Sequence, residues 1–264
     1  MYLVFSDVDG TVLDFNTYSS ELSREGIELL RERGIPLVLV SSKTLPEMKA
    51  VQSELNLSTP FVFENGGGIS LPGEDIEYLG MSVAELSGYL PVVRRVMREE
   101  IRIITEMTVD EVIGITGMSR ERAVYSQQRT TSLPFVISSK KKYTVIDIER
   151  CNEGLMPHGI EITKGGRFFH LLSMAVNKGN AVRRVTRHYL KNDAGSIVTA
   201  AIGDSENDIS MLREVDIPIA VRKYDGSAGI NGISNLFITD GIGPSGFTEA
   251  VSHIINHIQQ QEKS

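Results

Sequence analysis

Two acidic clusters, far apart along the chain, have the composition of a metal site. The first, DVDGT at residues 7–11, directly follows the apolar run at 2–6. Side chains two residues apart in a strand point the same way, so Asp7 and Asp9 can meet at the end of this strand. Two adjacent carboxylates repel each other, which favours a bound cation or a shared proton. Magnesium prefers oxygen ligands together with a substrate phosphate, although a solvated acidic turn has the same sequence pattern.

The second cluster, GDSEND at residues 203–208, also follows an apolar run and opens a helical pattern. The carboxyl ends of parallel strands form the ligand-binding edge of an open α/β sheet. Asp204 can therefore complete a magnesium site with Asp7 and with a backbone carbonyl such as that of Asp9. Asp208 lies one helical turn later, on the same helix face as Asp204. A helix N-cap explains one acidic residue here, but not a second acidic cluster at the same sheet edge.

Two further polar residues lie at the ends of predicted elements. Ser41 ends the apolar run at 36–41, where its hydroxyl or its backbone amide could hold a phosphoryl oxygen or make an ordinary strand-end hydrogen bond. Lys178 begins a helical pattern, and a cation at that end opposes the helix macrodipole. A phosphate and a nucleophilic carboxylate would compensate this charge, whereas an exposed surface lysine would need no compensation.

The spacing of apolar residues predicts the fold that positions these side chains. Short, nearly continuous apolar runs are typical of strands buried on both faces of a parallel sheet. They occupy residues 2–6, 36–41, 60–63, 196–202 and 217–221. Helical patterns lie between them at 21–33, from the capping box at 44–47, and at 178–191, 206–214 and 246–260. Strands that alternate with helices predict an α/β fold with a doubly wound, mostly parallel, Rossmann-like sheet.

The middle of the chain lacks this buried-parallel pattern. Capping boxes begin helical patterns at 82–99 and at Thr108. Strand-like stretches occur at 133–137, 143–148, 159–163 and 167–172. This mixture predicts a smaller α+β domain at 81–172, inserted into a core that consists of 1–80 and 173–264.

Composition limits the classes of function. A formal net charge of -7 argues against a strongly basic surface for nucleic acid. The single cysteine, Cys151, cannot form an intrachain disulfide and fits a reducing compartment. The first residues lack the basic flank of a signal peptide, and no stretch approaches the ~20 apolar residues of a membrane span. We therefore expect a cytoplasmic monomer or homodimer that binds neither nucleic acid nor membrane.

Four motifs together resemble those of haloacid dehalogenase (HAD) superfamily phosphatases with an inserted cap of the C2 type. In family order they are the segment 7–11, Ser41, Lys178 and the segment 203–208. The resemblance implies a Mg²⁺ cofactor and phosphoryl transfer through an aspartyl phosphate. The implied catalytic residues are Asp7, Asp9, Ser41 and Lys178, and the implied metal ligands are Asp7, Asp9, Asp204 and Asp208.

A finer resemblance is to the mannosyl-3-phosphoglycerate phosphatases. It rests on the segments SSKT at 41–44, FVFENGGG at 61–68, TGM at 116–118 and GRF at 166–168. It implies a phosphorylated sugar-glycerate substrate, whose candidate binding residues are Lys43, Asn65, Gly66, Arg129, Arg167 and Asn207. Arg129 and Arg167 are candidates for the glycerate carboxylate, because arginine binds carboxylates bidentately. That subfamily often follows a cap arginine with an acidic residue, whereas Thr130 and Thr131 follow Arg129 here.

The mechanism that this resemblance implies begins with in-line attack of Asp7 on phosphorus. Magnesium, Lys178 and Ser41 offset charge on the equatorial oxygens, and Asp9 acts first as general acid and then as general base. The inserted domain closes over the substrate and excludes water. The alternatives are a phosphatase for glucosyl-3-phosphoglycerate or a hexose phosphate, a phosphotransferase or mutase, and a receiver-like signalling module, which would be shorter and lack a cap.

Overall fold

Two β-sheets organise the chain, which the computed structural model describes over residues 1–139, 142–165, 167–192 and 196–261. Within these ranges the larger sheet has the strand order β12-β11-β10-β1-β2-β3-β4-β5. Its strands are β1 (Tyr2–Ser6), β2 (Leu37–Val40), β3 (Phe61–Phe63), β4 (Gly68–Ser70), β5 (Glu77–Tyr78), β10 (Val198–Gly203), β11 (Ile217–Arg222) and β12 (Phe237–Ile242). Neighbours from β12 to β3 are parallel, and among the described strands of this sheet the pairs β3–β4 and β4–β5 are antiparallel. The prediction of an α/β fold with a mostly parallel sheet is confirmed.

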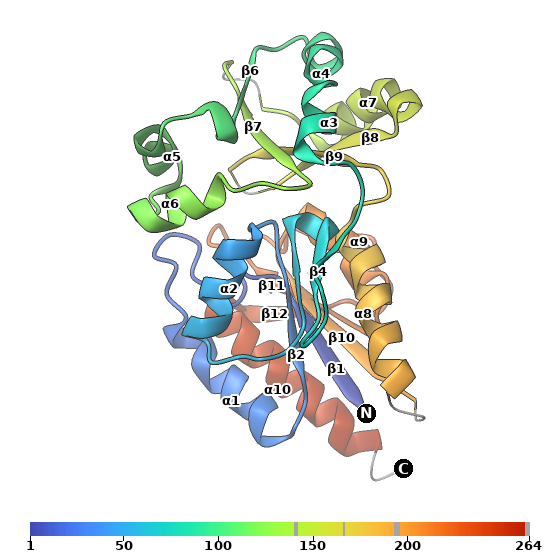
Figure 1. Ribbon diagram of the computed structural model, residues 1–264. Coiled ribbons are helices and arrows are strands. Elements are labelled where there is room, and N and C mark those ends of the chain that lie inside the picture. Colours follow the sequence, from blue (N-terminus) through green and yellow to red (C-terminus); the bar gives the residue numbers. More distant parts are fainter. Residues whose placement is uncertain (140–141, 166, 193–195, 262–264) are drawn as a thin grey trace.

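Helices cover both faces of this larger sheet, as Figure 1 shows. On one face, α1 (Arg24–Glu32), α2 (Leu45–Glu54) and α10 (Pro244–Gln261) pack apolar side chains against the strands. On the other face, α8 (Lys178–Asn192) and α9 (Ile209–Leu212) do the same. The chain leaves β1 toward β2 and later returns on its other side as β10. Open α/β sheets bind ligands at such a reversal, outside the carboxyl ends of the strands.

A smaller antiparallel sheet lies beyond those carboxyl ends (Figure 1), and we call it, with its helices, the cap. Its strands, in the spatial order β6-β7-β9-β8, are β6 (Ile101–Ile103), β7 (Leu133–Ile137), β9 (Phe169–Ser173) and β8 (Ile160–Lys164). One face packs against α3 (Val83–Ser87), α4 (Leu90–Met97) and α7 (Val145–Leu155). Of the remaining cap helices, α6 (Arg120–Ser126) lies over α2 of the core, and α5 (Val109–Thr116) packs against α6. The other face of the cap sheet is therefore turned toward the core.

Short 3₁₀ helices connect several of these elements. They are η1 (Glu21–Ser23), η2 (Glu64–Gly66), η3 (Ile104–Glu106), η4 (Met156–His158) and η5 (Glu206–Asp208). Among the described residues, no helix combines the length and the apolar composition that a membrane crossing requires.

The predicted strand at 143–148 is wrong, because these residues begin the helix α7. Thr144 caps this helix: its hydroxyl accepts a hydrogen bond from the Asp147 amide at 3.2 Å, and the Asp147 carboxylate accepts one from the Thr144 amide at 2.9 Å. Ile148 and Leu155 then lie on the buried helix face. The alternating apolar residues at the start imitate a strand, but the capping box and the helical spacing beyond it decide the structure.

Two predicted helices differ in extent from those observed. The helix predicted at 82–99 is divided at Gly88 into α3 and α4, and Pro91 lies in the first turn of α4, where its missing amide costs no hydrogen bond. The helix predicted at 206–214 is a 3₁₀ turn followed by the single turn of α9. The chain crosses between the two sheets after β5 and after β9. The division into 1–80 and 173–264 against 81–172 stays a prediction.

The buried carboxylate of Glu64 joins the core to the cap. Glu64 follows β3, and its side chain is 0% exposed. Its two oxygens accept hydrogen bonds of 2.6–3.4 Å from the amides of Thr130 and Thr131 and from the hydroxyls of Thr130, Thr131 and Ser132. The cap segment comes so close that a Cβ on Gly67 would lie 2.0 Å from Thr131 Oγ1. In the resembled subfamily an acidic residue often follows the cap arginine. Here Thr130 and Thr131 follow Arg129, and their hydroxyl groups bind the Glu64 carboxylate of the core.

Replacing this carboxylate should destabilise the protein. Glu64→Gln should lower the free energy of unfolding by about 1–3 kcal/mol, because an amide nitrogen cannot accept hydrogen bonds from buried donors. Urea unfolding should be compared with Glu85→Gln, where the carboxylate accepts two hydrogen bonds of 2.7 Å from Ser82 on an exposed helix cap. This control should lose much less stability, because the cap is exposed to water and glutamine also serves at this position of a capping box. Equal losses of stability in the two variants would contradict a special role for the buried hydrogen bonds between Glu64 and the cap.

Candidate active site

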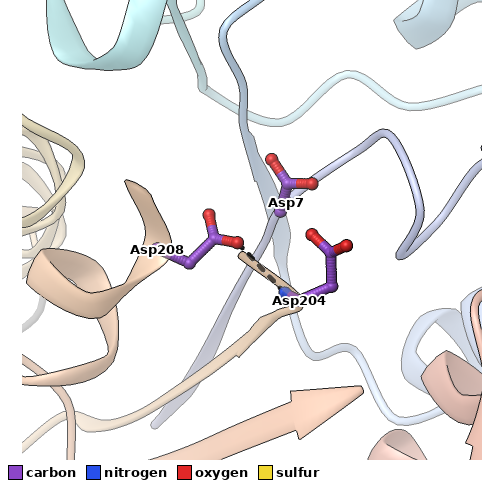
Figure 2. A group of neighbouring side chains, drawn as sticks. All are labelled: Asp7, Asp204 and Asp208. Atoms are coloured by element: carbon purple, nitrogen blue, oxygen red, sulfur yellow. Dashed lines mark hydrogen bonds between the residues drawn. The ribbon is translucent and has the colours of Figure 1, made fainter. Parts of the chain in front are cut away.

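Three buried carboxylates meet where β1 and β10 end, as Figure 2 shows. Asp7 follows β1, and Asp204 and Asp208 follow β10. One oxygen from each side chain lies within 4.8 Å of the corresponding oxygens of the other two. The parallel register pairs Ser6 with Ile202 and so brings the two strand ends together. The two acidic clusters of the sequence therefore lie side by side.

Burial makes several negative charges costly at this position. Burial raises the pKa of Asp7 well above its ordinary value, although the nearby ammonium of Lys178 acts in the opposite direction. Burial and the charge of Asp208 raise the pKa of Asp204 to about 6. A divalent cation between these oxygens would favour their charged forms. The donor set, which consists of carboxylate oxygens, fits a hard cation such as Mg²⁺.

The ammonium group of Lys178 completes this cluster. Its Nζ donates to Asp7 Oδ1 at 2.5 Å and to Asp208 Oδ1 at 2.6 Å, and the side chain is 0% exposed. Burial alone would lower the pKa of Lys178, but the carboxylates of Asp208 and Asp7 outweigh burial and raise it. Lys178 therefore remains charged beside Asp7, where a phosphoryl group would gain from a fixed positive charge.

Asp208 also fixes the loop that carries Asp204. Its Oδ2 accepts hydrogen bonds from the amides of Asp204 and Ser205, each at 3.0 Å. Gly203 allows this close packing, since a Cβ there would lie 2.6 Å from the Cβ of Asp208. Asp208 is near enough to be a metal ligand, and it also orients both Asp204 and Lys178.

Gly66 allows the start of α8 to approach the site. Its φ of 101° lies in the left-handed region, and a Cβ on Gly66 would lie 2.4 Å from the carbonyl oxygen of Asn177. Asn177 directly precedes Lys178, so the contact fixes where α8 begins. The neighbouring Asn65 accepts a hydrogen bond on Oδ1 from Asn207 Nδ2 at 3.1 Å. Asn207 lines the cavity described below, whereas Asn65 and Gly66 are not among the described residues that line it.

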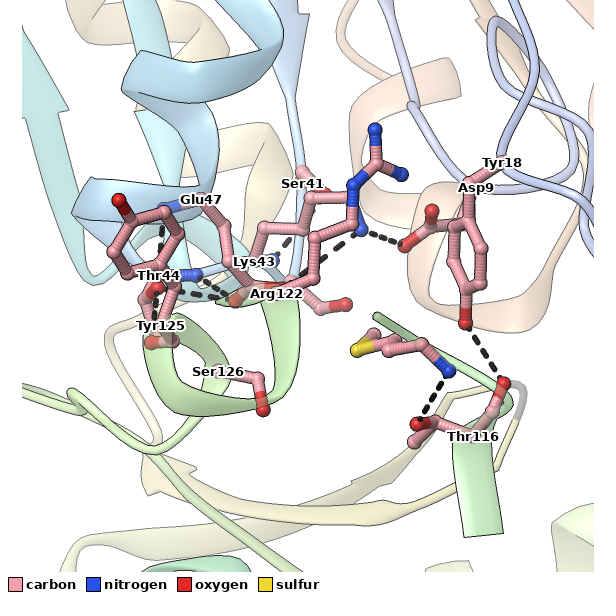
Figure 3. Close-up of polar contacts among 12 residues, drawn as sticks. Asp9, Tyr18, Ser41, Lys43, Thr44, Glu47, Thr116, Arg122, Tyr125 and Ser126 are labelled. Carbon is pink, nitrogen blue, oxygen red and sulfur yellow. Dashed lines mark hydrogen bonds and ion pairs between the residues drawn. The ribbon is translucent and has the colours of Figure 1, made fainter. Parts of the chain in front are cut away.

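The Asp9 side chain does not belong to the group of three clustered carboxylates. Its Oδ2 pairs with the buried Nζ of Lys43 at 2.9 Å (Figure 3), and its Oδ1 is buried with no hydrogen-bond partner among the described residues. Ser41 Oγ accepts a hydrogen bond from the Lys43 amide at 3.2 Å. The Ser41 amide donates to the carbonyl of Val62 within the sheet. Of the two Ser41 groups predicted for a phosphoryl oxygen, only the hydroxyl therefore remains available.

A cavity lies between the core and the cap, beside this cluster. Its walls include Asp7, Asp9, Lys43 and Asp204 from the core, and Arg129, Arg167 and His170 from the cap. The cavity wall therefore combines acidic groups of the core with cationic groups of both the core and the cap.

The two cap arginines at the cavity are held by backbone carbonyls. Arg129 donates from Nε to the carbonyl of Ser126 and from Nη1 to that of Ser42, both at 2.7 Å. Arg167 donates from Nη2 to the carbonyl of Phe15 at 3.1 Å, and its guanidinium lies 4.1 Å from the centre of the Phe15 ring. The contacts of Arg129 with Ser42 and of Arg167 with Phe15 join the cap to the core. Gly166, which belongs to one of the motifs predicted from sequence, lies outside the described residues.

Sequence reasoning missed Glu47 and Tyr18. Glu47 is predicted only as part of a capping box, yet its buried carboxylate also lies 3.9 Å from Lys43 Nζ and 3.8 Å from Arg129 Nη2. The hydroxyl of Tyr18 donates to the carbonyl of Thr116 in the cap at 3.1 Å, and its ring lies 5.4 Å from Lys43 Nζ (Figure 3). Lys43 and Glu47 are only four residues apart, but Arg129 and Thr116 come from distant segments, so these two partners have no signal in the local sequence.

The raised pKa of Asp204 predicts how the stability of the metal-free protein depends on pH. The folded state binds this proton more tightly than the unfolded chain, since the pKa moves from 3.8 to about 6. The resulting stabilisation is complete below the unfolded pKa and is lost as pH rises through the folded pKa. Relative to Asp204→Asn, the wild-type protein in EDTA should therefore lose on the order of 2 kcal/mol between about pH 4 and about pH 7.

Urea unfolding of both proteins at several pH values measures this difference. Adding millimolar Mg²⁺ above the folded pKa should restore the stability of the wild type and have little effect on Asp204→Asn. Parallel pH curves for the two proteins, with no response to Mg²⁺ in either, would contradict the assignment of Asp204 to a cation site.

Comparison with known proteins identifies relatives over nearly the whole chain. A protein of Persephonella marina named glucosyl-3-phosphoglycerate/mannosyl-3-phosphoglycerate phosphatase is 33% identical, with 98% of each chain covered. A protein of the same name from Methanococcoides burtonii is 32% identical over 96% of this chain and 97% of its own. Among solved structures, the sucrose-phosphatase of *Synechocystis*, in complex with sucrose and phosphate, superposes with a TM-score of 0.63 at 18% identity, covering 95% of this chain and 96% of the other.

The family assignment agrees with the fold and with the position of the site. The sequence model of the haloacid dehalogenase-like hydrolases matches residues 4–228, which include both acidic clusters and Lys178. The solved structure shares the fold alone at its low identity, whereas the two named relatives and the matched family establish membership. This chain belongs to the haloacid dehalogenase-like hydrolases.

Proposed function

We propose that this protein is a Mg²⁺-dependent phosphatase that hydrolyses mannosyl-3-phosphoglycerate and glucosyl-3-phosphoglycerate through an aspartyl-phosphate intermediate. The observation that carries the proposal is the buried ammonium of Lys178 between Asp7 and Asp208, beside Asp204 and next to the cavity. Fixed positive charge next to a nucleophilic carboxylate is what phosphoryl transfer requires. The names of the two relatives support the substrate class.

In the first step, a carboxylate oxygen of Asp7 attacks phosphorus in line and forms a new P–O bond, while the bond from phosphorus to the glycerate oxygen breaks. Lys178 and the hydroxyl of Ser41 offset charge on the phosphoryl oxygens that do not react. We assign Asp7, Asp204 and the backbone carbonyl of Asp9 as cation ligands, with Asp208 close enough to join them. The chemistry that bound Mg²⁺ supplies is electrostatic stabilisation of the same phosphoryl charge.

Proton transfer in both steps is assigned to Asp9. It donates a proton to the leaving glycerate oxygen and then takes one from the water that attacks the acyl phosphate. That attack releases inorganic phosphate and restores the Asp7 carboxylate. Lys43, whose Nζ lies 2.9 Å from Asp9 Oδ2, positions the Asp9 side chain at the cavity wall.

The remaining anionic group of the substrate is the glycerate carboxylate, and cationic side chains face the cavity to receive it. Lys43 comes from the core, and Arg129 and Arg167 come from the cap. Asn207 also lines the cavity. We assign Asn65 and Gly66 a supporting role, in which Asn65 holds the Asn207 side chain by a hydrogen bond and Gly66 packs on Asn177. A substrate that contacts both parts would favour the closed arrangement, in which water is excluded from the acyl phosphate.

We further propose that residues 81–172 act as the mobile cap over a core of 1–80 and 173–264. The cap closes around the substrate and opens for product release. The small phosphorylated substrate and the single cysteine are consistent with a cytoplasmic enzyme.

A substrate panel tests the proposal. With Mg²⁺, kcat/KM for phosphate release from the two glycosyl-3-phosphoglycerates should exceed that from 3-phosphoglycerate or glucose 6-phosphate by at least about 10-fold, since only the former fill the cavity. EDTA should abolish turnover, and Asp7→Asn should lower kcat by at least ~10⁴-fold while the protein stays folded. Substantial turnover by Asp7→Asn would reject the covalent scheme, and transfer of phosphate to a sugar hydroxyl would indicate a phosphotransferase.

The role of Asp9 makes a separate prediction. Asp9→Asn should lower kcat for the glycosyl substrates by about 10²–10⁴-fold, because both proton transfers are lost. With 4-nitrophenyl phosphate, whose leaving group needs no proton, the first step should survive and the second should stay slow. Rapid-quench kinetics should then show a burst of nitrophenol equal to the enzyme concentration. Unchanged steady-state turnover, or equal slowing of both steps, would remove the proposed role.

A further inference from the structure

The cap sheet turns one histidine toward the cavity. On β9, the alternate residues Phe169 and Leu171 belong to the apolar core of the cap. Side chains alternate across a strand, so His170 projects from the opposite face. It lines the cavity together with Asp7 and Arg129, and only 5% of it is exposed.

Two polar atoms at this place on the sheet lack partners. His170 Nδ1 and Thr163 Oγ1 are both buried with no hydrogen-bond partner in the described part of the chain. The register of β8 and β9 places Thr163 directly opposite His170. Buried polar atoms in folded proteins nearly always have a partner. His170 lines the cavity and Thr163 is its cross-strand neighbour, so two unpartnered atoms at this place indicate that the partner comes from outside the chain.

The chemistry of His170 favours a neutral partner. Burial lowers the pKa of His170 to about 3, and the positive charges of Arg129 and Lys178 act in the same direction. The ring is therefore neutral near pH 7, with one nitrogen that donates and one that accepts. An anionic group of a ligand would bind the cationic side chains of the same cavity. A hydroxyl group, which both donates and accepts, matches a neutral imidazole and a threonine hydroxyl.

We infer that His170 and Thr163 form a subsite that binds a neutral hydroxyl group of the sugar-glycerate alcohol esterified to the phosphate. This inference rests on the proposed function, since it assigns one part of that substrate to one part of the cavity. The phosphate is bound at Asp7 and Lys178, and the carboxylate at the arginines. The subsite binds the uncharged part of the substrate, and it therefore distinguishes a glycosyl phosphoglycerate from a small phosphate ester.

Matched variants test the subsite. Asparagine and leucine have nearly the same shape, but only His170→Asn keeps a polar atom near the position of Nδ1. Likewise, Thr163→Val removes the hydroxyl and keeps the branched shape. The measured quantity is kcat/KM for mannosyl-3-phosphoglycerate divided by kcat/KM for methyl phosphate. We expect this ratio to fall at least about 10-fold in His170→Leu, several-fold in Thr163→Val, and less than about 3-fold in His170→Asn.

The possible outcomes distinguish failure of the subsite inference from failure of the proposed function. If the wild type prefers mannosyl-3-phosphoglycerate but His170→Leu and Thr163→Val keep that ratio, the inference is overturned and a water molecule satisfies the two atoms. If His170→Asn falls as far as His170→Leu, ring packing explains the loss, and the inference is again overturned. If the wild type itself has no preference over methyl phosphate, the proposed function and the subsite both fail. Thermal unfolding identifies a variant that does not fold, and Thr163→Val then decides alone.

Discussion

The ammonium of Lys178, buried between two carboxylates, is the interaction on which the rest of the site depends. A buried charge is tolerated only when it is paired and hydrogen-bonded, and Lys178 has both Asp7 and Asp208 as partners. Asp208 in turn orders the loop of Asp204. Close backbone approach makes this possible, since a Cβ on Gly179 would lie 2.4 Å from the carbonyl oxygen of Ser210. The same arrangement that balances charge in the folded protein holds the Asp7 carboxylate next to a fixed ammonium group.

The cap meets the core through two kinds of contact. Some of the contacts are made by partly exposed side chains, such as Arg167 on Phe15 and Arg122 with Glu54. Glu64, in contrast, is fully buried and holds the segment 130–132. Exposed ion pairs and cation–π contacts contribute little each, whereas buried hydrogen-bonded carboxylates are costly to separate.

Much of the core could be predicted from the sequence, because its strands are buried on both faces and end in chemically distinctive residues. The convergence of Asp7 with the segment 203–208 followed from parallel strands sharing one edge. The cap was harder. The segment 143–148 alternates like a strand, and only its capping box and later apolar spacing reveal a helix. The contact of Glu47 with Arg129 and the position of His170 at the cavity each depend on distant segments, so local patterns carry no trace of them.

The three residues 64–66 have consecutive left-handed φ values of 49°, 58° and 101°, and each faces a different neighbour. The first binds the cap, the second binds Asn207, and the third packs on Asn177. A cap transplanted from a relative would therefore need hydroxyl or amide donors at the segment that docks on this turn, whatever its cavity wall contains. Exchange of residues that line the cavity can then change the substrate range. The turn at 64–66 meanwhile keeps the cap aligned with Lys178 and with the segment 203–208.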